Sequence, residues 1–160
     1  RMLAHLGFRV TGWSRSARDI ADVRCLHGMD QLPAALEGAE ILVTLLPNTP
    51  ETTDLLDAVR LAMLPVGAVI LNPGRGNVIV DDDLLAALDR GQIGAATLDV
   101  FRTEPLPADH PYWAHPRVTV TPHIAAETRP RSAARVVAEN IARIEAGQAP
   151  LYLVDRAKGY

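Results

Sequence analysis

The regular alternation of strand-like and helix-like segments restricts the fold of this chain more than any other feature of its sequence. Runs rich in β-forming residues occur at 8–13, 41–46, 68–71, 94–100 and 118–121, and helical patterns or turns separate them. The run at 41–46 is apolar throughout, which is typical of a strand buried in a parallel sheet. The alternation predicts an α/β fold in which helices cover a doubly wound, parallel sheet.

Residues that favour helix ends support the same fold. Three aspartates at 81–83 precede a helical pattern at 84–88, where acidic side chains can cap free N–H groups and oppose the positive end of the helix dipole. A long amphipathic helix is predicted over 130–145, with a proline in its first turn. Shorter helices are predicted at 31–36 and 52–63.

Composition narrows the class of protein and its partners. The 160 residues are 48% hydrophobic and 22% charged, as in an ordinary globular domain, and the net charge of −3 argues against nucleic acid or an anionic membrane as partner. No apolar run approaches the roughly 20 residues that span a bilayer. Arg129, Arg131 and Arg135 are expected to form the solvated face of a helix. The only cysteine, Cys25, cannot form an internal disulfide, and we expect a cytoplasmic protein.

Chemically active side chains follow the predicted strands. In a doubly wound sheet, ligands bind beyond the carboxyl ends of the strands. Those positions supply a pair of arginines, two carboxylates and a histidine, a convergence that packing alone does not explain. They are Ser14 and Arg15, Pro47 and Asn48, residues 72–76, Asp99 with Glu104, and Pro122 with His123.

Three motifs at these strand ends resemble the signatures of one enzyme family. They are N-P-G-R-G at 72–76, L-D-V-F-R-T-E-P at 98–105 and T-P-H-I-A-A at 121–126. In order and separation they are similar to the D-isomer-specific 2-hydroxyacid dehydrogenases. Each motif alone is a weak signal, whereas three in register are a strong one. The resemblance implies a Rossmann-type dinucleotide-binding domain.

Three further segments are similar to the glyoxylate/hydroxypyruvate reductase branch of that family. They are G-W-S-R-S at 12–16, L-L-P-N-T at 45–49 and V-D-R-A-K-G-Y at 154–160. This resemblance implies hydride transfer from a nicotinamide cofactor to a small 2-keto acid, such as glyoxylate or hydroxypyruvate. It also implies a homodimer, to which Trp113 and its proline-rich loop are expected to contribute.

By the resemblance, Arg75, Glu104 and His123 are the catalytic residues. Arg75 binds the substrate carboxylate and polarises the keto oxygen, because a planar guanidinium can donate two parallel hydrogen bonds to a carboxylate. His123 is the general acid that protonates the carbonyl oxygen. Glu104 holds the imidazole in one orientation and favours its protonated form. The residues alone leave other roles open: a surface arginine in a glycine turn, a structural histidine and an ordinary loop acid.

Cofactor contacts are also implied by the resemblance. Asp99 would hold the nicotinamide carboxamide, although an acid at this place can instead cap a turn. The loop at Leu46 and Pro47 would lie along the adenosine side of the cofactor, unless it is a simple turn. The remaining contacts are expected at Pro73, Gly74 and His123.

Ser14 and Arg15 predict which dinucleotide is used. Domains that bind NAD place an acidic residue after the second strand, where it holds the ribose 2′-hydroxyl. Here no acid occurs until Asp19, whereas hydroxyls and an arginine suit a 2′-phosphate. We therefore expect NADP(H) to be preferred, with NAD(H) as the second cofactor.

One part of the family pattern does not occur in the 160 residues: the Gly-rich phosphate loop G-x-G-x-x-G. Residues 2–6 look like the last turns of a helix that ends at Gly7. We therefore expect an N-terminally truncated piece of a longer enzyme that lacks the first strand and is inactive by itself. Residues 1–126 are expected to be a partial dinucleotide-binding domain, and 127–160 a helix and tail that return to the substrate domain.

Two other functions compete with this interpretation. Corepressors of the same family keep the fold and bind dinucleotide without catalysis, and they can keep the catalytic trio as well. A metal site is the other, but its candidate ligands fit no zinc spacing and share no helix face, so no metal is expected. Those candidates are His110, His115, His123 and Glu104.

Overall fold

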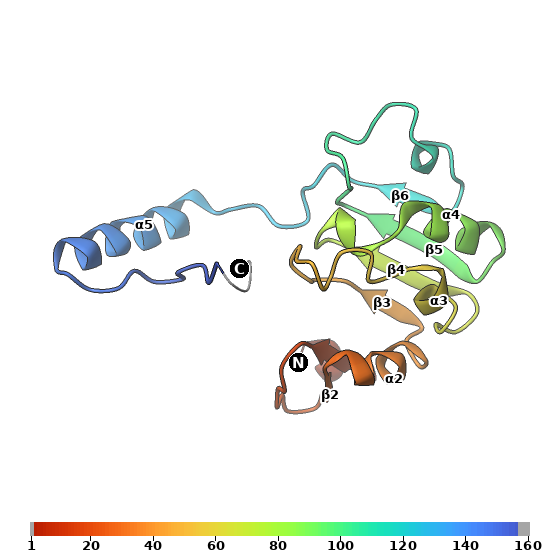
Figure 1. Cartoon of the computed structure of the whole chain (residues 1–160), viewed down its shortest axis with the longest axis horizontal. Coiled ribbons are helices and arrows are strands. Elements are labelled where there is room, and N and C mark those ends of the chain that lie inside the picture. The colour runs from red at the N-terminus through yellow and green to blue at the C-terminus, as the bar shows by residue number, and fades with distance from the viewer. Residues whose placement is uncertain (1, 157–160) are drawn as a thin grey trace.

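Four parallel strands form the main sheet, in the order β3, β4, β5, β6 (Figure 1). The computed structural model describes residues 2–156. The strands are β3 (Ile41–Val43), β4 (Ala68–Asn72), β5 (Ile93–Leu98) and β6 (Val118–Val120). Each neighbouring pair is parallel, so the carboxyl ends of all four strands meet at one edge of the sheet. The predicted α/β fold with a parallel sheet is confirmed.

A second, two-stranded sheet precedes the main one. Its strands, β1 (Thr11–Ser14) and β2 (Arg24–His27), are also parallel. The short helix α1 (Met2–His5) comes before them, and α2 (Leu32–Leu36) follows. The indole N–H of Trp13 donates to the Gly28 carbonyl at 2.7 Å and fastens β1 to the turn after β2.

The core lies between the four-stranded sheet and helices α3 (Ala58–Leu61) and α4 (Asp81–Asp89). Leu84 and Leu88, four residues apart on one face of α4, are fully buried together with Ile70 of β4 and Ile93 of β5. Each such side chain stabilises the fold by roughly 1.5–3 kcal/mol. The long helix is α5 (Pro130–Glu145), as predicted. Three short 3₁₀ turns complete the fold: η1 (Met29–Gln31), η2 (Gly76–Val78) and η3 (Pro111–Trp113).

The prediction of a helix over 52–63 is wrong for the first half of this segment. Only Ala58–Leu61 is helical, and Asp57 caps its start by accepting from the Arg60 amide at 2.9 Å. Upstream, Thr52 donates its hydroxyl to the Pro47 carbonyl at 2.6 Å and so stabilises a turn instead. Leu56 then forms a parallel bridge to Ile79. Side-chain bonds to nearby carbonyls therefore override the helical periodicity in this segment.

The prediction of a buried strand over 41–46 is also corrected. The strand ends at Val43, and Ile41, Val43 and Leu45 are 53%, 42% and 74% exposed. A buried strand needs neighbours on both edges, but within the described residues β3 pairs only with β4. Its other side borders a cavity of about 1440 Å³ between the two sheets, whose walls include Trp13 and Leu42.

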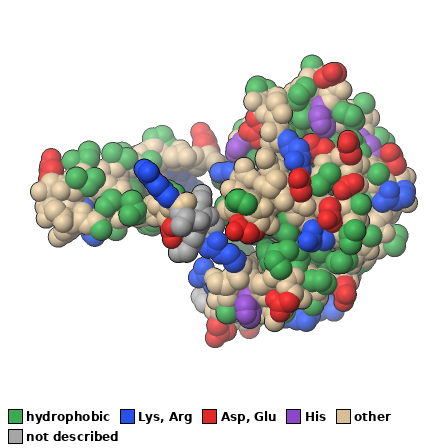
Figure 2. Space-filling view, viewed as in Figure 1, with side chains coloured by type: hydrophobic (Ala, Val, Ile, Leu, Met, Phe, Trp, Pro, Cys, Tyr) green, Lys and Arg blue, Asp and Glu red, His purple; other side chains and the backbone are tan. Residues whose placement is uncertain are grey.

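Helix α5 projects from the body that carries the sheets (Figure 1). Apolar residues on it are exposed, including Val137, Ile141 and Ile144, and Figure 2 shows hydrophobic side chains spread along this projection. The backbone of Leu151 in the tail bonds to the Asn140 side chain at 2.7 Å. The last part of the 154–160 motif, 157–160, lies outside the described residues. Between residues 2 and 156, no helix is long and apolar enough to cross a membrane.

Candidate active site

Asn72 organises the loop that leaves β4. Its side chain is buried, and its Oδ1 accepts from the Thr44 hydroxyl at 2.6 Å and from the Gly74 amide at 3.1 Å. Its Nδ2 donates to the Arg75 carbonyl at 3.1 Å. One buried amide thus fixes both the turn before Arg75 and the backbone of Arg75 itself, and it ties this loop to the end of β3.

Arg75 is exposed at the tip of this loop, and its Nη1 donates to the Gly74 carbonyl at 2.7 Å. The flanking glycines are required by close backbone contacts. A Cβ at Gly74 would lie 2.8 Å from the Thr44 carbonyl oxygen, and a Cβ at Gly76 would lie 2.0 Å from the Phe101 carbonyl carbon. The loop of Arg75 therefore packs directly against the segments that follow β3 and β5.

Asp99 follows β5 and is buried. Its Oδ1 accepts from the Thr121 hydroxyl at 2.5 Å and from the Ile124 amide at 2.9 Å, and its Oδ2 accepts from the Ala125 amide at 2.9 Å. Burial works to raise the pKa of Asp99, but these three hydrogen bonds hold it below the usual value. Asp99 therefore stabilises the loop on both sides of His123.

His123 and Glu104 are brought together from different loops. His123 Nδ1 lies 2.8 Å from Glu104 Oε2, while the other carboxylate oxygen accepts from the Phe101 amide at 2.9 Å. The hydrogen bond from His123, then the one from Phe101, and the charge of Arg75 lower the pKa of Glu104. The backbone of His123 has a φ of 55°, a left-handed conformation that its loop maintains. Arg75, Glu104 and His123 therefore share one electrostatic environment at the carboxyl edge of the sheet.

Ser14 is the last residue of β1, and Arg15 directly follows it. The Ser14 hydroxyl donates to the Ser16 carbonyl at 2.9 Å within its own loop. Arg15 is exposed, and its charge contributes to lowering the pKa of Glu51, after that carboxyl's backbone and Thr49 hydrogen bonds. Arg15 is thus near the loop that begins at Leu46 and Pro47, both half-buried.

The other two histidines among the candidate metal ligands have separate partners. His110 Nε2 lies 3.9 Å from Asp81, and His115 Nε2 lies 3.4 Å from Asp89. Over residues 2–156, the His, Cys, Asp and Glu side chains form no group of three or more that could hold a metal ion.

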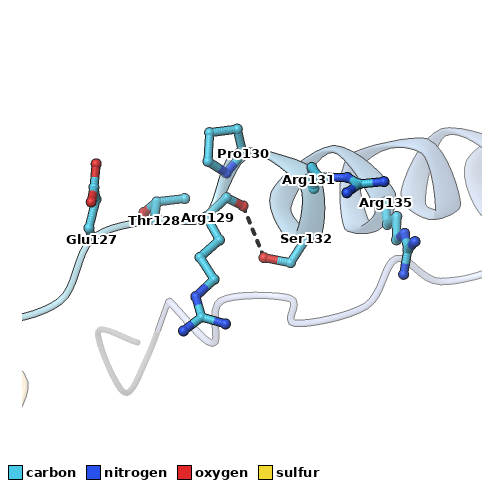
Figure 3. Close-up of a pocket in the computed structure, with 7 residues that line it drawn as sticks. All are labelled: Glu127, Thr128, Arg129, Pro130, Arg131, Ser132 and Arg135. Atoms are coloured by element: carbon cyan, nitrogen blue, oxygen red, sulfur yellow. Dashed lines mark hydrogen bonds between the residues drawn. The ribbon is translucent and has the colours of Figure 1, made fainter.

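A hollow of about 520 Å³ at the start of α5 lies outside the strand-end cluster (Figure 3). Arg129, Arg131 and Arg135 line it, and all three are exposed, as predicted for a solvated helix face. The Ser132 hydroxyl donates to the Arg129 carbonyl at 2.9 Å, within the first turn of the helix. This geometry is that of a helix start in water.

Comparison with known proteins decides the family. The model of the D-isomer specific 2-hydroxyacid dehydrogenases, NAD binding domain, matches residues 1–125. The chain belongs to this family. A glyoxylate/hydroxypyruvate reductase A from Serratia proteamaculans is 52% identical over 158 residues, covering 99% of this chain and 50% of the relative. The chain therefore spans about half the length of that relative.

Solved structures agree with this dehydrogenase family. A D-isomer specific 2-hydroxyacid dehydrogenase from Xanthobacter autotrophicus Py2, in complex with NADPH and MES, has a TM-score of 0.96 and 51% identity. The match covers 99% of this chain and 65% of that one. An NADPH-dependent glyoxylate/hydroxypyruvate reductase from Sinorhizobium meliloti, in complex with NADP and sulfate, has a TM-score of 0.94 and 41% identity, covering 99% of this chain and 52% of that one.

Some residues that shape the site were assigned no role from the sequence, although three of them lie within its motifs. Asn72 and Thr44 are the clearest, because both are buried and polar at the ends of apolar strands. A polar residue in such a place is costly unless hydrogen-bonded, and that signal is readable from the sequence. Thr121 and Arg102 carry no comparable signal, since their partners, Asp99 and Asp54, are 22 and 48 residues distant.

Proposed function

We propose that this chain supplies the cofactor-binding and catalytic part of a reductase that transfers a hydride from NADPH to a small 2-keto acid, such as glyoxylate or hydroxypyruvate. The observation that carries the proposal is the contact of 2.8 Å between His123 and Glu104, with the charge of Arg75 acting on the same carboxylate. Such a reduction needs a cation that binds the substrate carboxylate. It also needs a proton donor, here a histidine that an acidic residue orients.

In the proposed mechanism, Arg75 binds the substrate carboxylate and polarises the neighbouring carbonyl. When bound, NADPH supplies the hydride that reduces the carbonyl carbon. His123 donates a proton to the carbonyl oxygen from the ring nitrogen that does not face Glu104, so the product is the neutral hydroxyl of a 2-hydroxy acid. Glu104 holds the ring through Nδ1 and stabilises its positive charge before the proton is donated.

The residues present fit a phosphorylated dinucleotide. Gly74 brings the 72–76 loop into backbone contact with the segment after β3, so Pro73 and Gly74 adjoin the loop of Leu46 and Pro47. We assign these residues, with Ser14 and Arg15, to the cofactor. Arg15 has five N–H donors, enough to serve a 2′-phosphate while Glu51 is near. Asp99 already accepts three hydrogen bonds, so any bond to the carboxamide would use its remaining acceptor capacity.

The corepressor-like alternative has no observation in its favour, since the named relatives are reductases. We further propose that the enzyme is a homodimer, supported by the exposure of Trp113 on the loop after β5. We also propose that it is cytoplasmic, which the single cysteine supports. We also propose that the dinucleotide-binding part ends at residue 126 and that 127–160 contact the substrate domain.

The test is turnover. A chimera in which this chain replaces the matching half of the Serratia proteamaculans relative should oxidise NADPH when hydroxypyruvate or glyoxylate is added. The chain alone should bind NADPH weakly and not turn over. If a chimera that is folded and binds NADPH turned over neither hydroxypyruvate nor glyoxylate, the proposal would be contradicted.

A further inference from the structure

Arg102 lies in the loop between β5 and Glu104, and its side chain reaches away from the site. Nε and Nη2 donate to the Ile79 carbonyl at 3.2 Å and 2.6 Å, and Nη2 also bonds to the Asp54 carboxylate. Nε lies 3.7 Å from Asp81 Oδ2. The Arg102 side chain is 31% exposed and its partner Asp54 is 55% exposed, so the part-buried bonds to the Ile79 carbonyl, more than the ion pair, hold the guanidinium in place. One guanidinium therefore contacts two other segments of the chain, residues 79–81 and Asp54.

Ile79 and Asp81 belong to the segment that carries Arg75. Ile79 directly follows the 3₁₀ turn η2, which begins directly after Arg75. On its other side, this segment is bridged to Leu56, and the Asp54 amide donates to the Asn77 carbonyl at 2.8 Å. The acceptors of Arg102 thus lie on both sides of that bridge, and each is fixed by its own backbone bonds.

The loops of Arg75 and Glu104 are joined at two points. At the first, the backbones of Gly76 and Phe101 are in direct contact, without room for a side chain. At the second, Arg102 ties the following residues to Ile79. A single contact between two loops is a pivot about which they can rotate, whereas two contacts fix their relative orientation.

We propose that Arg102 is a positioning residue that sets Glu104, and through it His123, relative to Arg75. The effect of Arg102 on catalysis rests on the proposed function, whereas its effect on the position of Glu104 and His123 does not. Arg102 touches neither His123 nor the Glu104 carboxylate, so its effect is transmitted by the two-residue connection to Glu104. Substrate reduction needs Arg75 and His123 at a fixed separation, because they act on adjacent groups of one small molecule.

The direct test uses the chain itself and the NMR titration of the Glu104 carboxyl, assigned by its loss in Glu104→Gln. The His123 hydrogen bond lowers the pKa of Glu104, so His123→Ala should raise the midpoint of that titration in the parent chain. In an Arg102→Met background, the same His123→Ala substitution should raise it by less than about half as much, since the two residues no longer hold their contact. Arg75 and Asp99, the other charges facing this pair, are unchanged throughout.

Arg117 offers a matched control, because its Nη1 also donates to a backbone carbonyl, that of Leu88, at 2.7 Å. It precedes β6, at the opposite edge of the sheet from the site. Arg117→Met should leave the full response of Glu104 to His123→Ala. Arg102→Lys should restore part of it, since a lysine can bond one acceptor but lacks the fork. An unreduced response in folded Arg102→Met would overturn the proposal.

The catalytic consequence is measured in the chimera. Arg102→Met should lower kcat for hydroxypyruvate by about tenfold or more, with the KM for NADPH unchanged, and Arg117→Met should lower neither. If the parent chimera does not turn over, the proposed function fails and the NMR result still decides the role of Arg102. If the parent is active and Arg102→Met retains its kcat, the positioning role is wrong while the proposed function stands.

Discussion

The carboxylate of Asp99 accepts a hydrogen bond of 2.9 Å from the backbone amide of Ile124, the residue directly after His123. A second amide and the Thr121 hydroxyl bond to the same carboxylate, so a buried acid holds the strained loop that presents the histidine. In this account Asp99 acts on catalysis mainly by orienting His123.

Asp99→Asn should therefore destabilise the chain by about 1–3 kcal/mol at pH 7, because an amide cannot accept all three bonds. The pKa of Asp99 is lowered in the folded state, so its ionised form stabilises the fold above the usual carboxyl pKa of about 3.9. That stabilisation is lost as the pH falls through the lowered pKa. Denaturant unfolding should thus show a difference between Asp99→Asn and the parent that is constant near neutrality and shrinks below about pH 4. A difference that grows in acid would contradict this role.

Gly76→Ala tests the contact between the loops of Arg75 and Glu104. The added Cβ would lie 2.0 Å from the Phe101 carbonyl carbon, so the two backbones must separate. We expect a loss of about 1–3 kcal/mol in the free energy of unfolding. Gly38→Ala is the control, because nothing lies within 4 Å of its Cβ position, and it should change stability little. Equal effects of the two substitutions would mean that the close contact is not maintained in solution.

Much of this architecture was predictable from local pattern. The parallel sheet and the helix Pro130–Glu145 follow from the alternation of segments and from a proline in a first turn. The segment 52–63 was not predictable in this way, because the bond from Thr52 to the Pro47 carbonyl and the bridge from Leu56 to Ile79 compete with the helix. The exposure of Val43 depends on which strands pair on its open side, which hydrophobicity does not encode.

The site, like the fold, was predictable only where local sequence motifs specify it. The motifs identified Arg75, Glu104 and His123 as candidate catalytic residues, but the contacts that hold the loops of these residues depend on partners distant in sequence. The bond from Arg102 to Asp54 joins positions 48 apart, and that from Thr121 to Asp99 joins positions 22 apart. Such pairings are set by the fold of three loops together, and no short motif specifies them.

The cofactor preference can be tested by binding to the chimera. Arg15→Ala should weaken NADPH far more than NADH, because only NADPH carries the 2′-phosphate. A charge-assisted contact of this kind contributes roughly 1.5–3 kcal/mol, or about ten- to a hundredfold in affinity. Arg18→Ala, a nearby exposed arginine, is the control and should affect both cofactors equally. Equal losses in Arg15→Ala would show that Arg15 does not recognise the phosphate.

The contact between His123 and Glu104 predicts that reduction depends on both residues. His123→Asn should lower kcat by several powers of ten, since the proton donor is removed. Glu104→Gln should lower kcat by about tenfold or more, because the carboxylate that orients the imidazole is lost. A kcat of Glu104→Gln that equals that of the parent chimera would show that the two residues act separately.

The most direct test of the account is the kcat/KM for hydroxypyruvate of Arg75→Ala in the chimera, measured beside Arg75→Lys at saturating NADPH. Arg75 should bind the substrate carboxylate through two hydrogen bonds, so the alanine variant should lose about a hundredfold or more, and lysine should restore only part of it. The KM for NADPH should change little, because the substitution acts on the keto acid. If Arg75→Ala keeps most of the parent kcat/KM, the substrate is held by other groups and the proposed site is wrong.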